Sequence, residues 1–402
     1  MPKPSLADLL RDGSARHARG DLDGAERIYR RVLRAEPDDP NAHNLLGVLA
    51  RQRGNPAAAL AHTARALARQ PEAPAFLANH GGALAEAGQL PEAVRHLRAA
   101  LARRPADAVT LRNLGQALCA LGDAAGAVAP LRQATELTPA APEPWLALAH
   151  ALREVGEGPA AAAAAGRALG LPGIAPALAA QARFLLAAMG QGAAPERAPA
   201  AYVRDLFDQY APRFDADLEG RLGYRTPALL AALLRDAGLA ADASRQVLDL
   251  GCGTGLSGIA LKPFARRLEG LDLSPRMLAE AAKRGLYDRL HEADLLDWLP
   301  RHRGAFDLVA AADVLNYLGD LGPALMATAG ALTPGGIAAF SIEAGADAPY
   351  ALGAGLRYRH DPAHVLGLCE AAGLLPVARR AETLREERGV PVAGELLILR
   401  RT

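Results

Sequence analysis

The chain has 402 residues, of which half are apolar and only 4% are aromatic, and its formal net charge is +1. This length is too great for one hydrophobic core, so two or three domains are expected. A net charge so close to zero excludes a global attraction to nucleic acid or to an anionic membrane.

The N-terminus, MPKPSLADLL, lacks the basic region and apolar run of a signal peptide. The three cysteines, Cys119, Cys252 and Cys369, lie far apart and form no C-x-x-C pair. This spacing argues against a disulfide framework and against a structural zinc site, and no metal is expected. We therefore expect a soluble cytoplasmic protein.

A repeat of 34 residues runs through the first half of the chain. It is marked by prolines, glycines and alanines at equivalent positions: Pro37, Pro71, Pro105 and Pro139; Gly47, Gly81 and Gly115; Ala25, Ala59, Ala93, Ala127 and Ala161. Small residues at this period suit the crossing of two helices in a hairpin, and each proline ends the second helix. The pattern predicts an all-α solenoid of helical hairpins.

This portion resembles the tetratricopeptide repeat (TPR) family over about residues 6–173, with four good repeats and a weaker fifth. The resemblance implies a groove that holds a peptide or protein partner of unknown identity. Asn79 and Asn113, one repeat apart, resemble the asparagine ladder with which some TPR proteins hold a peptide backbone. Two solvated residues on a helix face are the alternative.

The period fails after Arg167. Residues 175–190 still have a helical pattern and are expected to cap the solenoid, and GQGAAPERAPA (190–200) has the composition of a linker. We therefore predict a solenoid over 6–189, a linker over 190–200 and a second domain over 201–402. This domain begins with an amphipathic helix whose aromatic stripe (Tyr202, Leu206, Tyr210, Phe214) forms a lid over a ligand or packs in the core.

Strands and helices alternate from residue 246 onward, which predicts an α/β domain with a parallel sheet. Four predicted strands end at or just before an acid: Asp249, Asp272, Asp294 and Asp313. Ligands of such sheets bind at the carboxyl ends of the strands. The four acids therefore predict a binding site at one edge of the sheet.

The glycine-rich turn GCGTGLSG allows two interpretations. Gly253-x-Gly255-x-x-Gly258 matches a dinucleotide-binding fingerprint, and Asp272 lies 19 residues beyond Gly253, where a dehydrogenase places its ribose-binding acid. Asp249 within the motif, Asp294 after the third strand and the segment LTPGGIAAFSIE favour a different nucleoside cofactor. An NAD(P) oxidoreductase is the less favoured hypothesis.

The segments VLDLGCGTGLSG, ADLLDWL, FDLVAAADVLNYL and LTPGG resemble the class I methyltransferase family, from about Tyr202 to the end of the chain. The resemblance implies a Rossmann-like domain with a parallel sheet and a C-terminal antiparallel strand, and S-adenosylmethionine as cofactor. It implies that Gly251, Gly253 and Gly255 let the backbone approach the methionine part of the cofactor closely.

The same resemblance implies a role in cofactor binding for each of the acids at the strand ends. Asp249 is expected near the cofactor's ammonium, directly or through water, Asp272 at both ribose hydroxyls and Asp294 at the adenine amino group. The remaining cofactor contacts are expected from neighbours of these strand ends: Leu273, Met277, Leu295 and Asp313. A position in the core is the alternative for Met277.

Methyl transfer needs alignment of a nucleophile and exclusion of water, so no strong catalytic signature is expected. Asn316 and Tyr317, after the fourth strand, are candidate catalytic residues, and Tyr224 and Tyr358 are further acceptor-side candidates. They do not form the N-P-P-Y or D-P-P-Y pattern of enzymes that methylate nucleobase or glutamine amines. His360 is a candidate base, although it also opens a predicted helix. Packing is the alternative for each.

The combination resembles a group of bacterial predicted methyltransferases with TPR repeats. We therefore expect an S-adenosylmethionine-dependent methyltransferase that acts on a small molecule or a carrier-bound substrate, with no nucleic acid or membrane partner. An interaction protein whose methyltransferase domain is a sensor or is inactive is the alternative.

Overall fold

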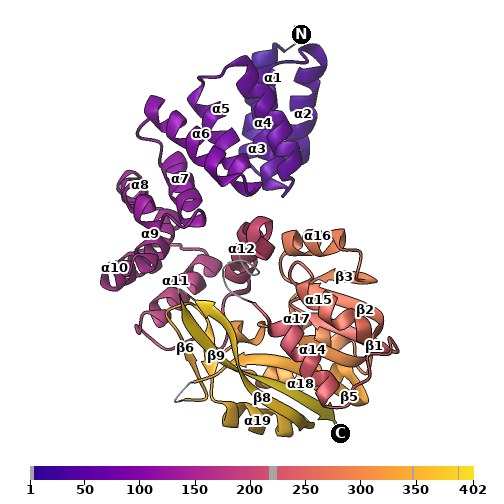
Figure 1. Ribbon diagram of the computed structural model, residues 1–402. Coiled ribbons are helices and arrows are strands. Elements are labelled where there is room, and N and C mark those ends of the chain that lie inside the picture. The colour runs from indigo at the N-terminus through magenta and orange to yellow at the C-terminus, as the bar shows by residue number, and fades with distance from the viewer. Residues whose placement is uncertain (1–3, 217–223, 346–347, 388) are drawn as a thin grey trace. The chain divides into compact units, whose positions relative to one another are not determined.

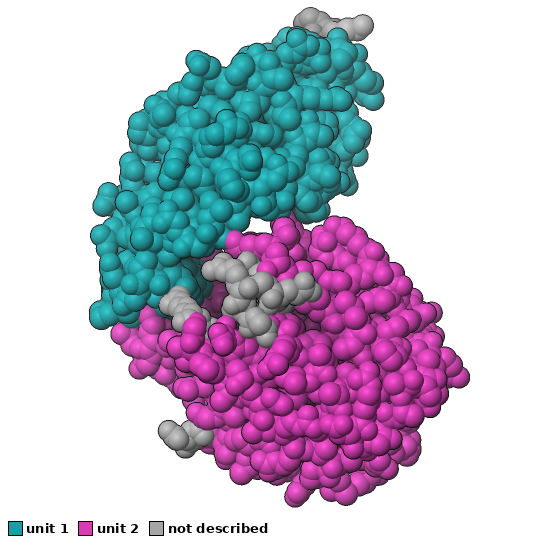
Figure 2. All heavy atoms as spheres, viewed as in Figure 1, with its two compact units in different colours: residues 1–174 teal, residues 175–402 magenta. Residues whose placement is uncertain are grey.

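The computed structural model describes residues 4–216, 224–345, 348–387 and 389–402. The chain forms two compact units, residues 1–174 and 175–402 (Figure 2). Among the described residues, no helix is both long enough and apolar enough to cross a membrane.

The first unit consists, in its described part, of helices in antiparallel pairs (Figure 1). Their bounds are α1 (Leu6–Ala18), α2 (Leu22–Ala35), α3 (Pro40–Gln52), α4 (Pro56–Arg69), α5 (Pro74–Glu86), α6 (Leu90–Arg103), α7 (Ala108–Ala120), α8 (Ala124–Leu137), α9 (Pro142–Glu154) and α10 (Gly158–Leu169). These five pairs confirm the all-α repeat architecture expected from the 34-residue period.

The periodic small residues lie where two helices of a pair cross. A Cβ atom added at Gly81 of α5 would lie 2.8 Å from Cγ of Leu97 in α6, and Gly47 and Gly115 face Thr63 and Leu131 in the same way. Ala93 is completely buried in the same hairpin. The small residues of the 34-residue period therefore stand where the backbones of two paired helices approach each other closely.

The helix after the solenoid repeats belongs to the second compact unit. In α11 (Pro176–Ala188), Phe184 is fully buried, and its ring lies 5.4 Å from that of Tyr202 in α12 (Ala200–Tyr210) and 6.2 Å from that of Tyr358. The segment expected to be a linker is bonded to the same unit: the Tyr358 hydroxyl donates to the Pro195 carbonyl at 2.6 Å. The domain bounds 6–189, 190–200 and 201–402 stay a prediction.

The second unit contains a seven-stranded sheet in the order β3-β2-β1-β4-β5-β9-β8 and a two-stranded sheet, β6-β7. The strands are β1 (Arg245–Leu250), β2 (Ala265–Asp272), β3 (Arg289–Glu292), β4 (Phe306–Ala311), β5 (Leu332–Glu343), β6 (Tyr350–Leu352), β7 (Tyr358–His360), β8 (Leu374–Glu387) and β9 (Val390–Arg401). Strands β1 to β5 are parallel, and β9 runs antiparallel to β5 and β8. This topology confirms the predicted Rossmann-like fold.

Helices cover both faces of this sheet (Figure 1). The helices and helical turns of this unit after α12 are η1 (Ala211–Arg213), α14 (Thr226–Asp236), α15 (Leu256–Leu261), η2 (Lys262–Phe264), α16 (Pro275–Lys283), α17 (Leu295–Trp298), η3 (Leu299–Arg301), η4 (Leu315–Tyr317), α18 (Gly322–Ala331) and α19 (Pro362–Ala371), in the described residues. Successive residues of β1 enter different cores, since Val247 packs with Leu234 of α14, and Leu248 packs with Leu325 of α18. Burial on both faces explains the continuous apolar runs of the central strands.

Candidate functional site

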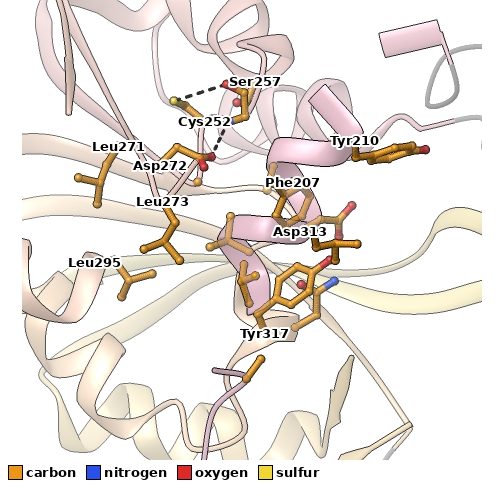
Figure 3. A pocket seen from close by; sticks show the side chains of 18 of the residues that line it. Phe207, Tyr210, Cys252, Ser257, Leu271, Asp272, Leu273, Leu295, Asp313 and Tyr317 are labelled. Atoms are coloured by element: carbon orange, nitrogen blue, oxygen red, sulfur yellow. Dashed lines mark hydrogen bonds between the residues drawn. The ribbon is translucent and has the colours of Figure 1, made fainter. Parts of the chain in front are cut away.

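A pocket of about 380 Å³ lies at the carboxyl ends of the parallel strands, entirely within the second unit. It is lined by residues that follow β1, β2, β3 and β4 and by side chains from α12 and η1. In Figure 3, Asp272, Leu273 and Leu295 lie toward one end, and Asp313, Tyr317 and Tyr210 lie toward the other. We call these the strand-β2 end and the strand-β4 end.

The glycine turn between β1 and α15 forms the floor between the two ends. Gly251, Gly253 and Gly255 all have positive φ angles, of 59°, 54° and 91°. A side chain at Gly251 would also collide with Val314. Gly251 and Gly253 line the pocket, whereas Gly255 caps α15 and faces Arg284 and Tyr287.

Asp272 joins the end of β2 to this turn. Its carboxylate accepts hydrogen bonds from the backbone N–H groups of Gly253 at 2.9 Å and Ser274 at 2.8 Å. Burial raises the pKa of Asp272, and these two backbone donors oppose that rise. Each oxygen keeps acceptor capacity toward the pocket, since a carboxylate oxygen has two lone pairs.

Asp294 is the N-cap of α17, where its carboxylate accepts from the backbone N–H of Leu296 at 2.9 Å. It also forms an ion pair with Arg197, which lies in the segment before α12. That segment is fixed against the loop after β4, because the N–H of Ala198 donates to the carbonyl of Tyr317 at 2.9 Å. Arg197 lines the pocket and was not expected there from the sequence.

Asp249 lies below the glycine turn and does not line the pocket. It is completely buried, and one carboxylate oxygen accepts from the hydroxyls of Ser257 and Tyr287, each at 2.6 Å. Its other oxygen, Oδ1, has no hydrogen-bond partner among the described residues. Burial raises the pKa of Asp249 to about 7, with the two hydroxyl donors opposing the rise.

Aromatic side chains from α12 and η1 form one wall of the pocket. The rings of Phe207, Tyr210 and Phe214 pack edge to face, and Phe207 makes the same contact with Tyr317 at 5.5 Å between centroids. Leu206, Tyr210 and Phe214 of the predicted stripe line the pocket. Tyr202 packs on Phe184 instead, and Phe207 takes its place in the wall.

The strand-β4 end is a polar network centred on Asp313. This residue has a φ of 55°, which places its backbone in the left-handed region, and its carboxylate accepts from Thr226 at 3.1 Å and Ser341 at 3.2 Å. Burial raises the pKa of Asp313, and Arg385 opposes that rise. Local backbone strain of this kind is concentrated at functional sites.

Arg385 of β8 links this network to Asn316. It is 4% exposed, forms an ion pair with Glu343 of β5 and lies 3.7 Å from Asp313. The amide nitrogen of Asn316 donates to the same Glu343 carboxylate at 3.0 Å. Arg385, Glu343 and Thr226 carry no local sequence motif, and the sheet brings them together from distant positions in the chain.

Of the predicted site residues, nine line this one pocket: Gly251, Gly253, Asp272, Leu273, Asp294, Leu295, Asp313, Asn316 and Tyr317. Tyr224 lines it too. Five others do not: Asp249, Gly255, Met277, Tyr358 and His360. Met277 is fully buried in α16, consistent with the alternative of a core position.

His360 lies behind the loop that carries Asn316 and Tyr317. Its Nε2 faces the carbonyls of Leu318 at 2.9 Å and Gly319 at 3.1 Å, so this nitrogen carries the hydrogen that donates to them. Burial lowers the pKa of His360. This placement suits a residue that positions the loop, and its predicted role as a base stays a prediction.

Family models match both halves of the chain. A model described as a methyltransferase domain matches residues 248–338, and a tetratricopeptide repeat model matches residues 10–76 and 78–142. The expected combination of TPR repeats and a methyltransferase domain is therefore confirmed. The methyltransferase match indicates S-adenosylmethionine as the cofactor.

Curated relatives cover the second half only in part. Methyltransferase-like protein 27 of Homo sapiens is 38% identical over 113 residues, which are 28% of this chain and 46% of that protein. Ubiquinone biosynthesis O-methyltransferase of Aromatoleum aromaticum is 32% identical over 111 residues, 27% of this chain and 46% of that protein. Trans-aconitate 2-methyltransferase of Paracidovorax citrulli is 31% identical over 179 residues, 39% of this chain and 66% of that protein. The chain thus spans about half the length of the first two relatives.

Proposed function

Since the chain carries TPR repeats followed by a methyltransferase domain, we propose that it is an S-adenosylmethionine-dependent methyltransferase whose repeats bind a protein or peptide partner. The acceptor is a small molecule or a carrier-bound substrate. The observation that supports this most is that the glycine turn, Asp272 and Asp294 border one pocket whose other end carries a separate polar network.

The residues of the strand-β2 end fit the cofactor. Gly253 has a positive φ, and a Cβ atom added there would meet no atom closer than 3.8 Å, so its space is open toward the pocket. Asp272 and Asp294 are acceptors for the ribose hydroxyls and the adenine amino group, beside Leu273 and Leu295. Oδ1 of Asp249, which has no partner among the described residues, lies below the turn, and we assign this carboxyl group to the cofactor's ammonium, directly or through water.

S-adenosylmethionine supplies a methyl group activated by its positively charged sulfur. The protein then has to hold the acceptor in line with that methyl group and to exclude water. Phe207, Tyr210 and Phe214 supply the apolar wall that excludes water, and Asn316 and Tyr317 border the acceptor's place.

Calorimetric titration of the full chain with S-adenosylhomocysteine tests the cofactor assignment. Asp272→Asn keeps an acceptor for one of the two backbone N–H groups, which donate to different carboxylate oxygens, and removes the charge. It should weaken binding at least about tenfold, because hydrogen bonds to charged groups contribute about 1.5–3 kcal/mol each. Glu292→Gln is the matched control, since Glu292 pairs with Asp272 in the β2–β3 register but is exposed and does not line the pocket.

Wild-type protein that releases no heat on titration would contradict the cofactor assignment. Equal affinity of Asp272→Asn and wild type would contradict the ribose role. Protein that binds S-adenosylhomocysteine but transfers no methyl group to any fraction of a cell extract would favour the alternative, an interaction protein with an inactive domain.

A further inference from the structure

Arg197 and Asp294 form an ion pair at the edge of the pocket, although 97 residues separate them in the sequence. Nη1 and Nη2 of the guanidinium donate to Oδ1 and Oδ2 of the carboxylate, the first at 3.4 Å. Both side chains line the pocket, and both are partly exposed, Arg197 by 34% and Asp294 by 14%. A guanidinium that meets both oxygens of a carboxylate fixes the orientation of that carboxylate as well as its position.

The backbone on both sides of Arg197 is held by hydrogen bonds to the loop after β4. The carbonyl of Glu196 accepts from the N–H of Gly319 at 2.7 Å. The N–H of Ala198 donates to the carbonyl of Tyr317 at 2.9 Å. An exposed ion pair contributes little to stability because two mobile side chains must be ordered to form it. Here the fixed backbone of Arg197 removes part of that cost, so the pair is well suited to hold Asp294 in place.

Asp294 keeps one acceptor position for a ligand. Its Oδ1 accepts from the N–H of Leu296 at 2.9 Å and from Arg197, and its Oδ2 accepts from Arg197. Each carboxylate oxygen has two lone pairs, so Oδ2 retains one of them. Without Arg197, Leu296 would be the one partner among the described residues that still orients the carboxylate. The carboxylate could then rotate and turn the remaining lone pair of Oδ2 away from a ligand.

We propose that Arg197 is a positioning residue for adenine recognition, which holds the Asp294 carboxylate in the orientation that accepts a hydrogen bond from the adenine amino group. This inference rests on the proposed function. It gives a part in cofactor binding to a residue that precedes the matched methyltransferase domain, 248–338. Because Arg197 acts through Asp294, its effect on affinity depends on the presence of the amino group.

Calorimetric titration of the full chain with two ligands isolates this effect. One ligand is S-adenosylhomocysteine, and the other is the same molecule with a hydrogen atom in place of the adenine amino group. Arg197→Gln should weaken binding of S-adenosylhomocysteine at least about fivefold and change the affinity for the analogue by less than about twofold. A merely structural role of Arg197 would weaken both ligands alike, because such a role does not involve the amino group.

Further variants test whether Arg197 acts through Asp294. Asp294→Asn should show the same dependence on the amino group, since asparagine also caps a helix but cannot form the ion pair. The double variant Arg197→Gln/Asp294→Asn should bind S-adenosylhomocysteine about as tightly as Asp294→Asn alone, because the two residues act in one contact. Arg204→Gln is the matched control and should leave both affinities unchanged, since Arg204 is exposed on α12 and does not line the pocket.

Arg197→Lys keeps the positive charge and loses the two-bond geometry of the guanidinium. It should show the same dependence on the amino group to a smaller extent. Should Arg197→Gln not fold, the comparison of the two ligands with Arg197→Lys decides the question.

Equal losses of affinity for the two ligands, or no loss for either, would overturn the inference. Tighter binding of S-adenosylhomocysteine by Arg197→Gln would also overturn it, because the ion pair would then block the site. Wild-type protein that binds both ligands equally well would show that Asp294 does not recognise the amino group, and the inference would fail with it. Wild-type protein that does not bind S-adenosylhomocysteine would instead overturn the proposed function, so the two failures are distinguishable.

Discussion

Asp249 shows how a residue can serve the site without touching the pocket. Its carboxylate connects Ser257 of α15 and Tyr287 to the end of β1, so the glycine turn is held from below. Its burial is complete, which raises the pKa to about 7 from an ordinary value of 3.8. The ionised form is thus disfavoured in the folded chain.

This shift predicts a pH-dependent stability. The unfolded chain releases the Asp249 proton near pH 4 and the folded chain near pH 7, so this residue makes the free energy of unfolding fall as pH rises between those values. A gap of about three pH units corresponds to a change on the order of 4 kcal/mol. Asp249→Asn keeps an acceptor for the two hydroxyls and lacks this proton, so its melting temperature should rise relative to wild type between pH 4 and pH 8.

Thermal unfolding of both proteins across this pH range measures the effect. A difference in melting temperature between variant and wild type that stays constant from pH 4 to pH 8 would refute the assignment.

Local patterns made the positions of two pocket acids predictable. Asp272 ends β2 and Asp294 follows β3, so their positions at one edge of the sheet could be inferred from spacing alone. Arg197 and Arg385 could not be inferred, because Arg197 meets Asp294 across 97 residues and Arg385 meets Glu343 across 42. No local pattern marks a contact that only the completed sheet creates.

At the scale of elements, the hairpins of the first unit depend on close helix crossings. Leu97, which faces Gly81, is completely buried, so it has little freedom to move away from an added methyl group. A glycine within a helix normally weakens it relative to alanine. At this crossing, the loss of room for the Leu97 side chain outweighs the gain in helix propensity that alanine would bring.

Two Gly→Ala substitutions should therefore have opposite effects. Gly81→Ala should lower the free energy of unfolding of the repeats by about 1–3 kcal/mol, the usual cost of overpacking. Gly166→Ala in α10, where an added Cβ atom meets nothing within 4 Å, should raise it by about 0.5–1 kcal/mol. Denaturant unfolding followed by circular dichroism measures both, and a stabilised Gly81→Ala would show that the crossing is not tight.

Some strands could be predicted from the sequence pattern, whereas the pairing of β8 could not. The parallel strands β1, β2, β4 and β5 follow from apolar runs that end in characteristic turns or acids. Strand β8 begins with five apolar residues and continues with a mixture of charged, polar and apolar residues that has no regular alternation. It pairs antiparallel with β9, and this pairing brings Arg385 to the pocket. Nothing near Arg385 in the sequence indicates which strand it will lie beside.

At the scale of the molecule, the chain has two compact units, each with its own buried residues. The 34-residue period predicted the first, and the glycine turn with its strand-end acids predicted the second. The boundary was harder to predict, because the composition of residues 190–200 is that of a linker while Pro195 and Arg197 are bonded within the second unit. The pocket lies wholly in that unit.

A crystal structure of the full chain with S-adenosylhomocysteine tests the central claim most directly. The account predicts both ribose hydroxyls within hydrogen-bond distance of the Asp272 carboxylate and the adenine amino group beside Asp294, with the homocysteine part over Gly251 and Gly253. A nucleoside bound away from these two carboxylates, or bound outside the strand-end pocket, would contradict it.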